Sequence, residues 1–221
     1  MEENLPVLRS CPFFMGLNDV EIMSILHCVN GVKASKAAGS YIFRAGDSTE
    51  VMGLVLAGST LIIQEDLWGH RNILSKCNTG DFFGEPYAAT PGAVLNISVV
   101  AEEDCEILFL NIKRLLITCP TACDHHQKLI RNLVSVLANK ILIFNDKITH
   151  VSKRSTRDKL LSYLSAESVK KASLSFDIPF DRQQLADFLC VERAAMSVEL
   201  SKLQKEGLLK TNRNHFELIV K

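Results

Sequence analysis

The clearest chemistry in this sequence is hydrogen bonding to DNA, offered by arginine, glutamine and small polar side chains near the C-terminus. Arg193 carries a planar fork of donors that fits the O6 and N7 acceptors of guanine. At helical spacing, Ala194, Val198 and Ser201 share one face, and small side chains there let a helix enter a major groove about 12 Å wide. The residues expected to contact DNA are Arg182, Gln183, Arg193, Ala194, Ser197, Val198, Ser201, Lys210 and Arg213.

Two short helices are needed to position these side chains, and the sequence predicts both. The segment FDRQQLADFL places Leu185 and Leu189 one turn apart, with Asp181 as the N-cap. Three residues then break the pattern, and RAAMSVELSKLQKEG resumes an apolar stripe from Met196 to Leu203. Two short helices with inward stripes and a tight connection predict a helix-turn-helix. An ordinary helical core that binds no nucleic acid is the alternative.

A short β-hairpin is expected directly after the second helix. Gly207 ends that helix, Leu208 and Leu209 begin a strand, and TNRN turns the chain back into HFELIV. Such a hairpin is the wing of a winged helix-turn-helix. Lys210 and Arg213 would lie on it and add charged phosphate contacts, while Arg182 anchors the helix before the reading helix.

The charge is unevenly distributed, although the chain is neutral overall. Residues 152–221 carry 13 Lys and Arg against 9 Asp and Glu, whereas residues 1–151 carry 12 against 16. A basic C-terminal third suits phosphate contacts. The excess is small, so it supports the helix-turn-helix prediction without establishing it.

The sequence gives no indication that the protein enters a membrane or is exported. No apolar run approaches the roughly 18 residues of a membrane span, and MEENLPVLRS lacks the apolar core of a signal peptide. The seven cysteines are an odd number without a CxxC pair, which predicts free thiols in a reducing compartment. We therefore expect a soluble, cytoplasmic protein with no membrane partner.

Residues 1–120 predict a β domain. After a short amphipathic helix over 18–29, glycines separate short apolar runs such as SYIFRA, VMGLVLA, STLIIQED and RNILSK. Many short strands joined by glycine turns predict a sandwich or small barrel, and the whole chain an α+β protein. The sequence contains no catalytic triad, paired-carboxylate site or phosphate-binding loop, so it predicts no catalytic residues and no enzyme.

A long helix is expected over 121–149, where the sequence has no Gly or Pro, and residues 121–151 would form a dimerisation helix and hinge. One apolar seam repeats at alternating spacings of four and three, as in a coiled coil. A second stripe, Leu129, Leu133 and Val136, would pack on the chain's own β domain. A seam buried in a larger monomeric core is the alternative to a homodimer. The seam consists of Ile130, Val134, Leu137, Ile141, Phe144 and Ile148.

The polar segment 152–157 then leads into the DNA-reading domain, over 152–221. In this order the parts resemble the Crp/Fnr family of bacterial transcription regulators, and the resemblance covers nearly the whole chain. The matching segments are YIFRAGD, VLAGS and GDFFGE in the β domain and RQQLADFLCVERAAMSVELSKLQKEGLL in the reader. The resemblance implies a cyclic-nucleotide-binding-like β-barrel, or jelly roll, that senses a small effector, a long dimerisation helix and a winged helix-turn-helix. The partners it implies are double-stranded DNA, a second copy, the effector and RNA polymerase.

The β domain departs from the cyclic-nucleotide-binding members of that family. In them a Gly-Glu pair is followed, about ten residues later, by an arginine that clamps the cyclic phosphate. This chain has Gly84 and Glu85, but Leu95 and Asn96 stand at the clamp position. A buried phosphate without its cation loses a charge-assisted pair. We therefore expect a small effector other than cyclic AMP, with Glu85 either bonding backbone amides or contacting a different ligand.

The reading helix departs from the family as well. Members often carry arginine at the positions of Arg193 and Val198, and only Arg193 is present here. Val198 cannot hydrogen-bond a base, but its methyl groups can pack on a thymine methyl. Cys190 occupies the turn position where glycine is usual, which either strains the turn slightly or requires a left-handed backbone at that residue. The operator sequence is therefore expected to differ from the family's usual one.

No metal or haem cofactor is expected, although two groups of residues have suitable chemistry. Cys119, Cys123, His125 and His126 lie where the long helix starts, and His70 beside Trp68 and Cys77 could present a haem ligand. Different helix faces argue against the first group, and a simple exposed hairpin tip explains the second. Cys11 and Cys28 do not form the tight cluster that an iron–sulfur centre needs.

One other class of function fits the same domain order. An effector-sensing β domain could bind a protein partner after DNA binding has been lost. The wing, the basic residues of the hinge and the small-residue face of the reading helix argue against this alternative. Salt-dependent retention on DNA would separate the two functions.

Overall fold

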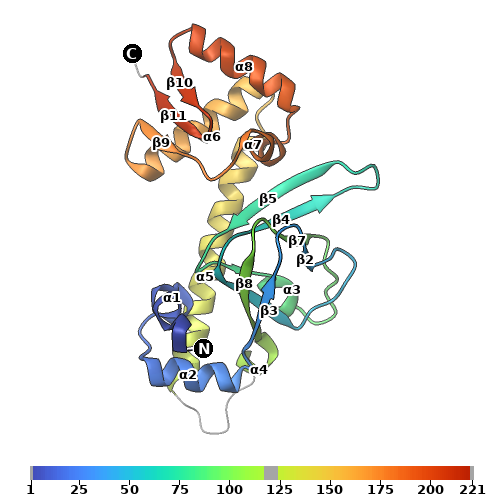
Figure 1. Cartoon of the computed structure of the whole chain (residues 1–221), viewed down its shortest axis with the longest axis vertical. Coiled ribbons are helices and arrows are strands. Elements are labelled where there is room, and N and C mark those ends of the chain that lie inside the picture. Colours follow the sequence, from blue (N-terminus) through green and yellow to red (C-terminus); the bar gives the residue numbers. More distant parts are fainter. Residues whose placement is uncertain (1, 117–123, 220–221) are drawn as a thin grey trace. The chain divides into compact units, whose positions relative to one another are not determined.

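The computed structural model of this chain describes residues 2–116 and 124–219 and contains two units, Met1–Asn139 and Lys140–Lys221 (Figure 1). The first unit holds the β domain and most of the long helix. The second holds the end of that helix and the winged helix-turn-helix. Each unit has its own buried core.

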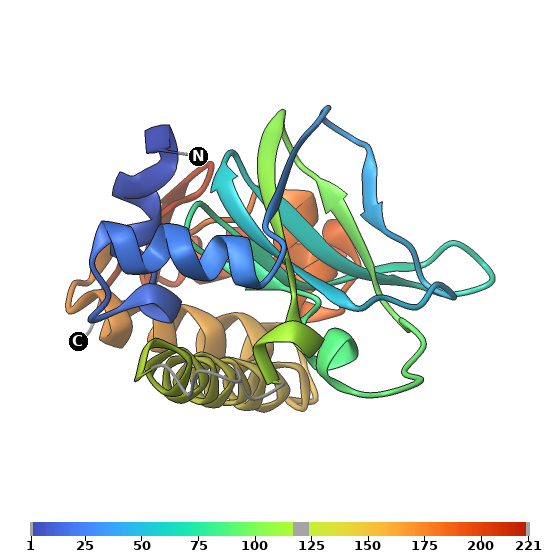
Figure 2. The same ribbon diagram turned by 90° about the horizontal axis from the view of Figure 1, so that it is seen from below.

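Short helices open the first unit. They are η1 (Glu2–Asn4), α1 (Leu5–Ser10), η2 (Pro12–Phe14) and α2 (Asp19–Cys28). The start of α2 is fixed by a capping box, in which Asn18 accepts from the Glu21 amide at 3.0 Å and Glu21 accepts from the Asn18 amide at 2.8 Å. Phe13 and Phe14 bury the apolar side of this helical layer, which lies beside the sheets (Figure 2).

Two four-stranded antiparallel sheets form the β domain. Their orders are β1-β8-β3-β6 and β2-β7-β4-β5, so neighbouring strands are distant in sequence apart from the β4–β5 hairpin, as in a jelly roll. The two sheets do not close into a barrel, and the expected jelly-roll sandwich is confirmed. Two short helices, α3 (Glu85–Ala89) and α4 (Ile112–Leu116), complete the unit. The strands are β1 (Val32–Lys36), β2 (Tyr41–Phe43), β3 (Val51–Ala57), β4 (Thr60–Glu65), β5 (Arg71–Cys77), β6 (Phe82–Phe83), β7 (Ser98–Ala101) and β8 (Cys105–Asn111).

The long helix α5 (Asp124–Val151) has the two apolar stripes that the sequence predicts. Leu129 and Leu133 are buried in the core of the first unit, and Val136 packs against it. Most of the predicted seam is exposed, including Ile141, whose exposed fraction is 60%. Leu137 differs, since it also packs partly on the chain's own core. The predicted beginning of the helix at residue 121 lies outside the described residues.

The second unit is a winged helix-turn-helix. Its elements after α5 are α6 (Thr156–Lys171), β9 (Ser175–Asp177), α7 (Arg182–Leu189), α8 (Arg193–Lys205), β10 (Leu209–Asn212) and β11 (His215–Leu218). The three strands form one antiparallel sheet in the order β10-β11-β9. The wing hairpin is where the sequence places it, whereas the expectations from the sequence do not include α6 and β9. None of the helices in the described parts of the chain is long and apolar enough to cross a membrane.

Candidate DNA interface and effector site

The turn of the helix-turn-helix is fixed by local interactions. Asp181 caps α7 by accepting from the Gln184 amide at 2.8 Å, and the Gln184 side chain accepts from the Asp181 amide at 3.0 Å. Cys190 ends α7 in the left-handed region with φ of +53°, as expected for a position where glycine is usual. Lys159 on α6 holds the turn from outside by donating to the carbonyl oxygens of Leu189 and Cys190, both at 3.2 Å.

One face of α8 is buried and the opposite face is open. Met196, Leu200 and Leu203 lie in the core of the unit. The predicted DNA-contacting residues of α8 are all exposed and face away from this core: Arg193, Ala194, Ser197, Val198 and Ser201. Arg193, at the beginning of the helix, is the one charged residue among these five.

The polar groups on this face remain available to a ligand. Ser197 donates to the Arg193 carbonyl at 2.9 Å, and Ser201 donates to the Ser197 carbonyl at 3.0 Å. Each hydroxyl thereby uses its proton within the helix and keeps lone pairs that can accept hydrogen bonds. The Arg193 side chain makes no hydrogen bond or ion pair with any described residue, so all five of its donors are free.

Arg182, which the sequence predicts as a phosphate anchor, is only partly exposed. Its Nη2 donates to Thr211 Oγ1 at 2.6 Å, and its guanidinium lies 5.0 Å from the centre of the Phe216 ring. Burial lowers the pKa of Arg182, and Nη1 is buried without a partner among the described residues. Arg182 thus joins α7 to the wing, and its contact with phosphate stays a prediction.

The other predicted contacts lie at the edge of the reading surface. Gln183 is exposed and donates to Asp187 Oδ1 at 2.8 Å. Lys210 on the wing pairs with Glu217 at 3.3 Å, while Arg213 is exposed in the wing turn with φ of +53°. These side chains lie on the surface and can exchange their partners for phosphate oxygens at small cost.

One of the basic hinge residues has a structural role. Arg157 on α6 donates to Glu199 at 3.2 Å and to Glu206 at 3.0 Å, so it ties α6 to α8. The Arg157 hydrogen bonds lower the pKa of Glu206, and Glu206 in turn raises the pKa of Arg157. The sequence predicts Arg157 only as one of the basic hinge residues that favour DNA binding. No local pattern indicates its structural role, because both carboxylates lie more than forty positions later.

Three residues of the predicted effector site, Gly84, Glu85 and Leu95, are buried. Glu85 begins α3 and is 1% exposed, and Leu95 is 2% exposed in the core between the sheets. Gly84 has φ of +79°, and a Cβ there would lie 2.6 Å from Phe43. Asn96 is exposed, and its side-chain oxygen accepts a hydrogen bond from the Tyr87 hydroxyl.

Aromatic side chains fill the space around Gly84 and Leu95. The rings of Phe43 and Phe83 meet edge to face at 5.4 Å, and those of Phe43 and Phe109 lie 6.0 Å apart. They belong to one apolar cluster with Leu95. The described residues of this cluster are uncharged, so none of them supplies a cation.

Of the two groups with metal-binding chemistry, only the second is fully described, and its His70 and Cys77 lie apart. His70 Nδ1 is 2.7 Å from Asp66 at the exposed tip of the β4–β5 hairpin, whereas Cys77 is buried at the other end of β5. Cys119 and Cys123 lie outside the described residues. His125 Nδ1 is 3.1 Å from Glu21, and no cluster of three metal-ligating side chains is present among the described residues.

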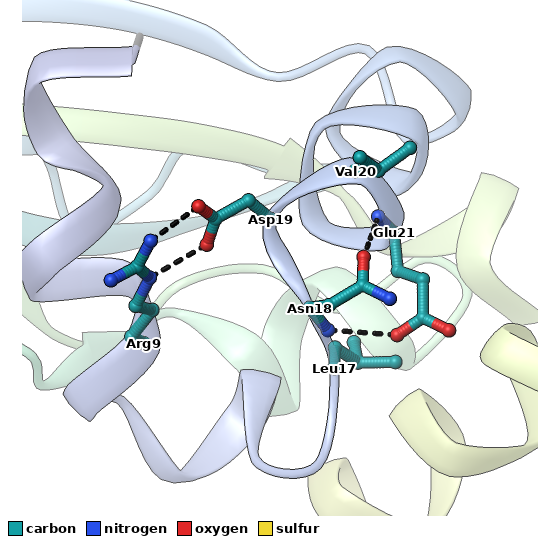
Figure 3. Close-up of a pocket in the computed structure, with 6 residues that line it drawn as sticks. All are labelled: Arg9, Leu17, Asn18, Asp19, Val20 and Glu21. Carbon is teal, nitrogen blue, oxygen red and sulfur yellow. Dashed lines mark hydrogen bonds and ion pairs between the residues drawn. The ribbon is translucent and has the colours of Figure 1, made fainter.

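A surface pocket at the start of α2 has its polar groups already paired (Figure 3). It is lined by Arg9 and residues 17–21. Arg9 makes a bidentate pair with Asp19, with Nε 2.6 Å from Oδ1, while Asn18 and Glu21 form the capping box. These pairings leave no convergent polar groups for a ligand.

Comparison with known proteins matches both units. The family described as "Cyclic nucleotide-binding domain" matches residues 34–119, and the "Crp-like helix-turn-helix domain" matches residues 158–221. The CRP-like protein Clp of Xanthomonas campestris is 24% identical over 173 residues, which cover 76% of this chain and 75% of that protein.

Solved structures share the fold. The structure of the c-di-GMP-responsive global regulator CLP of Xanthomonas campestris has a TM-score of 0.73 at 19% identity, covering 92% of this chain and all of that one. FixK2 of Bradyrhizobium japonicum gives 0.65 at 17% identity, covering 86% and 93%. CprK in complex with OCPA gives 0.70 at 16% identity, covering 90% of each chain.

Proposed function

We propose that α8 reads the major groove as part of a homodimer. The chain belongs to the Crp/Fnr family and is a transcription regulator with an effector-binding domain and a DNA-binding helix-turn-helix. The observation that carries the proposal is the division of α8 into a buried stripe, from Met196 to Leu203, and an open face with Arg193 and Val198. A helix with this division can enter a groove without disturbing its own core.

The exposed side chains define what is read. Arg193 at the beginning of α8 has five free donors and suits guanine, whereas Val198 further along suits a thymine methyl. Ser197 and Ser201 present acceptors to base or backbone donors. Around them, Gln183, Lys210 and Arg213 supply phosphate contacts.

The test is selection of binding sites from random DNA, followed by titration of an Arg193→Ala variant. Loss of a bidentate guanine contact costs about 1–3 kcal/mol and relaxes one base position in each half-site. Arg114→Ala is the matched control, because it removes the same charge from an exposed position on α4. An Arg193→Ala protein with unchanged base preference would contradict the proposed docking.

The homodimer rests on the exposed seam of α5. A coiled-coil spacing of apolar side chains that remain in solvent favours a second copy over burial in the chain's own core. A two-fold dimer requires a pseudo-palindromic operator with half-sites about one helical turn apart. An asymmetric single-site motif from the selection experiment would contradict the homodimer.

The effector is proposed to be a small molecule other than cyclic AMP. Leu95 supplies no charge where a cyclic phosphate needs one, and Phe43 and Phe83 occupy the space beside Gly84. Related regulators are described as c-di-GMP-responsive or as complexed with OCPA, so this fold accepts different effectors. Calorimetry with cyclic AMP, cyclic GMP and c-di-GMP is the test, and micromolar binding of either mononucleotide would contradict the proposal.

Two further properties are proposed from the family's function as transcription regulators. The protein contacts RNA polymerase when bound at its operator, and it works in the cytoplasm without catalysing a reaction. The alternative, a sensor that binds a protein partner and has lost DNA binding, is disfavoured by the open face of α8. Salt-dependent retention of the full chain on DNA distinguishes the two, because phosphate contacts weaken as salt rises.

A further inference from the structure

The wing is attached to both helices of the helix-turn-helix through one threonine. Thr211 Oγ1, on β10, accepts a hydrogen bond from Arg182 Nη2 on α7 at 2.6 Å and donates one to the His215 carbonyl on β11 at 2.9 Å. The Thr211 backbone amide donates to Gln204 Oε1 on α8 at 3.3 Å. The hydroxyl thereby uses its one proton and accepts a charge-assisted bond, so this residue holds the wing hairpin against α7 and α8.

The Arg182 guanidinium is turned toward the wing. It lies 5.0 Å from the centre of the Phe216 ring, and Phe216 is completely buried opposite Thr211 in the β10–β11 pair. Nη1 is buried too, without a partner among the described residues. A phosphate is gripped best by two guanidinium nitrogens at once. With Nη2 bonded to Thr211 and Nη1 covered by protein, the fork of Arg182 is not presented to DNA in that way.

Packing alone does not explain an arginine at position 182. A buried donor without a partner costs free energy, and a methionine could pack on Phe216 without that cost. What the arginine adds is the charge-assisted hydrogen bond to Thr211. Lys210 directly precedes Thr211, and Arg213 lies in the wing turn two residues after it. The hydrogen bond therefore fixes the part of the wing that carries both basic side chains.

We infer that Arg182 acts on DNA binding through the wing, as a positioning residue that aligns Lys210 and Arg213 with their phosphates. It takes the place of the phosphate anchor that the sequence predicts at this position. The inference rests on the wing contacts proposed above. Positioning and direct contact lead to different results, because only positioning depends on the charges of the wing.

The experiment is a double-mutant cycle on the full chain, with the operator obtained by selection. Arg182→Met removes the donors and keeps the packing, and a wing-neutral protein carries Lys210→Gln with Arg213→Gln. We expect Arg182→Met to weaken DNA binding about tenfold in the unaltered chain and less than about twofold in the wing-neutral protein. An equal effect in both backgrounds would overturn the inference, because a phosphate anchor acts without the wing.

The salt dependence of binding gives a second readout of the same cycle. Each phosphate contact contributes about 0.9 to the slope of log affinity against log salt. Arg182→Met should therefore flatten the slope by up to about two in the unaltered chain, where both wing contacts are lost, and leave it unchanged in the wing-neutral protein. A slope that falls by about one in both backgrounds would show direct contact and overturn the inference.

A second variant leaves the charge of Arg182 in place. Thr211→Val removes the hydroxyl and keeps a β-branched side chain that suits a strand. It should weaken DNA binding as much as Arg182→Met does, and the double variant should bind no more weakly than either single variant. Unchanged DNA binding by Thr211→Val would overturn the inference. Arg114→Met is the matched control, because it makes the same substitution at an exposed position in the first unit.

Thermal unfolding separates positioning from a general loss of structure. Arg182→Met should melt no lower than the unaltered chain, since it removes the buried Nη1. A melting temperature that falls together with DNA affinity in both backgrounds would show a merely structural role and overturn the inference. A wing-neutral protein with unchanged DNA affinity would refute the wing contacts and this inference together, whereas an additive cycle would refute the inference alone. The Arg193→Ala test of α8 is independent of both results.

Discussion

Lys147 allows a direct energetic test of how the second unit is packed. Its ammonium lies over the Phe188 ring, and burial lowers the pKa of Lys147 from its ordinary 10.5 to about 8. Lys147→Met keeps a flexible side chain of similar length against Phe188 and removes the charge. We expect this substitution to stabilise the unit at neutral pH.

Linkage between protonation and folding gives the size and the sign. A pKa change of one corresponds to about 1.4 kcal/mol, so a fall from 10.5 to about 8 is a penalty on the order of 3 kcal/mol. Below pH 8 the folded and unfolded chains both carry the proton, and the penalty is fully present. Between pH 8 and 10.5 the unfolded chain holds more protons than the folded chain, so the stability contributed by Lys147 rises with pH.

The measurement is urea-induced unfolding of the unaltered protein and of Lys147→Met at matched pH values from 7 to 10.5. Unfolding is monitored by circular dichroism and by hydrogen exchange of the α6 backbone amides. Comparing the two proteins at each pH cancels the titration of other groups, such as Cys11 and Tyr163, whose pKa values are raised by burial. The variant should be more stable by about 3 kcal/mol at pH 7 and nearly equal at pH 10.5. A difference that does not change with pH would refute the buried-charge argument.

Three further predictions follow from other parts of the chain. Ile141→Lys places like charges across the seam of the proposed dimer, at a cost of several kcal/mol, on the order of a buried unpaired charge. Sedimentation at low micromolar concentration should therefore show a monomer. A persistent dimer would contradict the assignment of the seam. Cys190→Gly removes a left-handed non-glycine residue and should raise the free energy of unfolding by up to about 1 kcal/mol, and a destabilised variant would contradict the strain. Gly84→Ala should lower the melting temperature, because its Cβ would meet Phe43 at 2.6 Å; an unchanged value would show that the aromatic core yields.

Local sequence signals predict the helix-turn-helix well because its determinants are local. The capping residue Asp181, the left-handed Cys190 and the stripe from Met196 to Leu203 each depend on neighbours within a few positions. The same holds for the wing, whose turn lies between Asn212 and His215. The open face of α8 then follows, since the buried stripe fixes the rotation of the helix.

The features that sequence reasoning missed depend on distant residues. Arg182 packs on Phe216, more than thirty positions later, and no local pattern distinguishes that contact from a free phosphate anchor. The helix α6 buries only Leu160, Tyr163 and Leu164 among many polar residues, so its periodicity is weak. The strand β9 has three residues and gains its conformation from pairing with β11.

The segment GDFFGE can be present for two reasons, either to pack the sandwich or to hold a nucleotide. Gly84 is required by its positive φ and by the approach of Phe43, and Phe83 is required by the core, so packing alone explains both. Glu85 is buried at the start of α3. A segment that resembles a cyclic-nucleotide motif can therefore maintain the fold without holding a nucleotide. We therefore expect selection of the effector to rest on shape and hydrogen bonds, because the buried Leu95 offers no cation to a cyclic phosphate at that position.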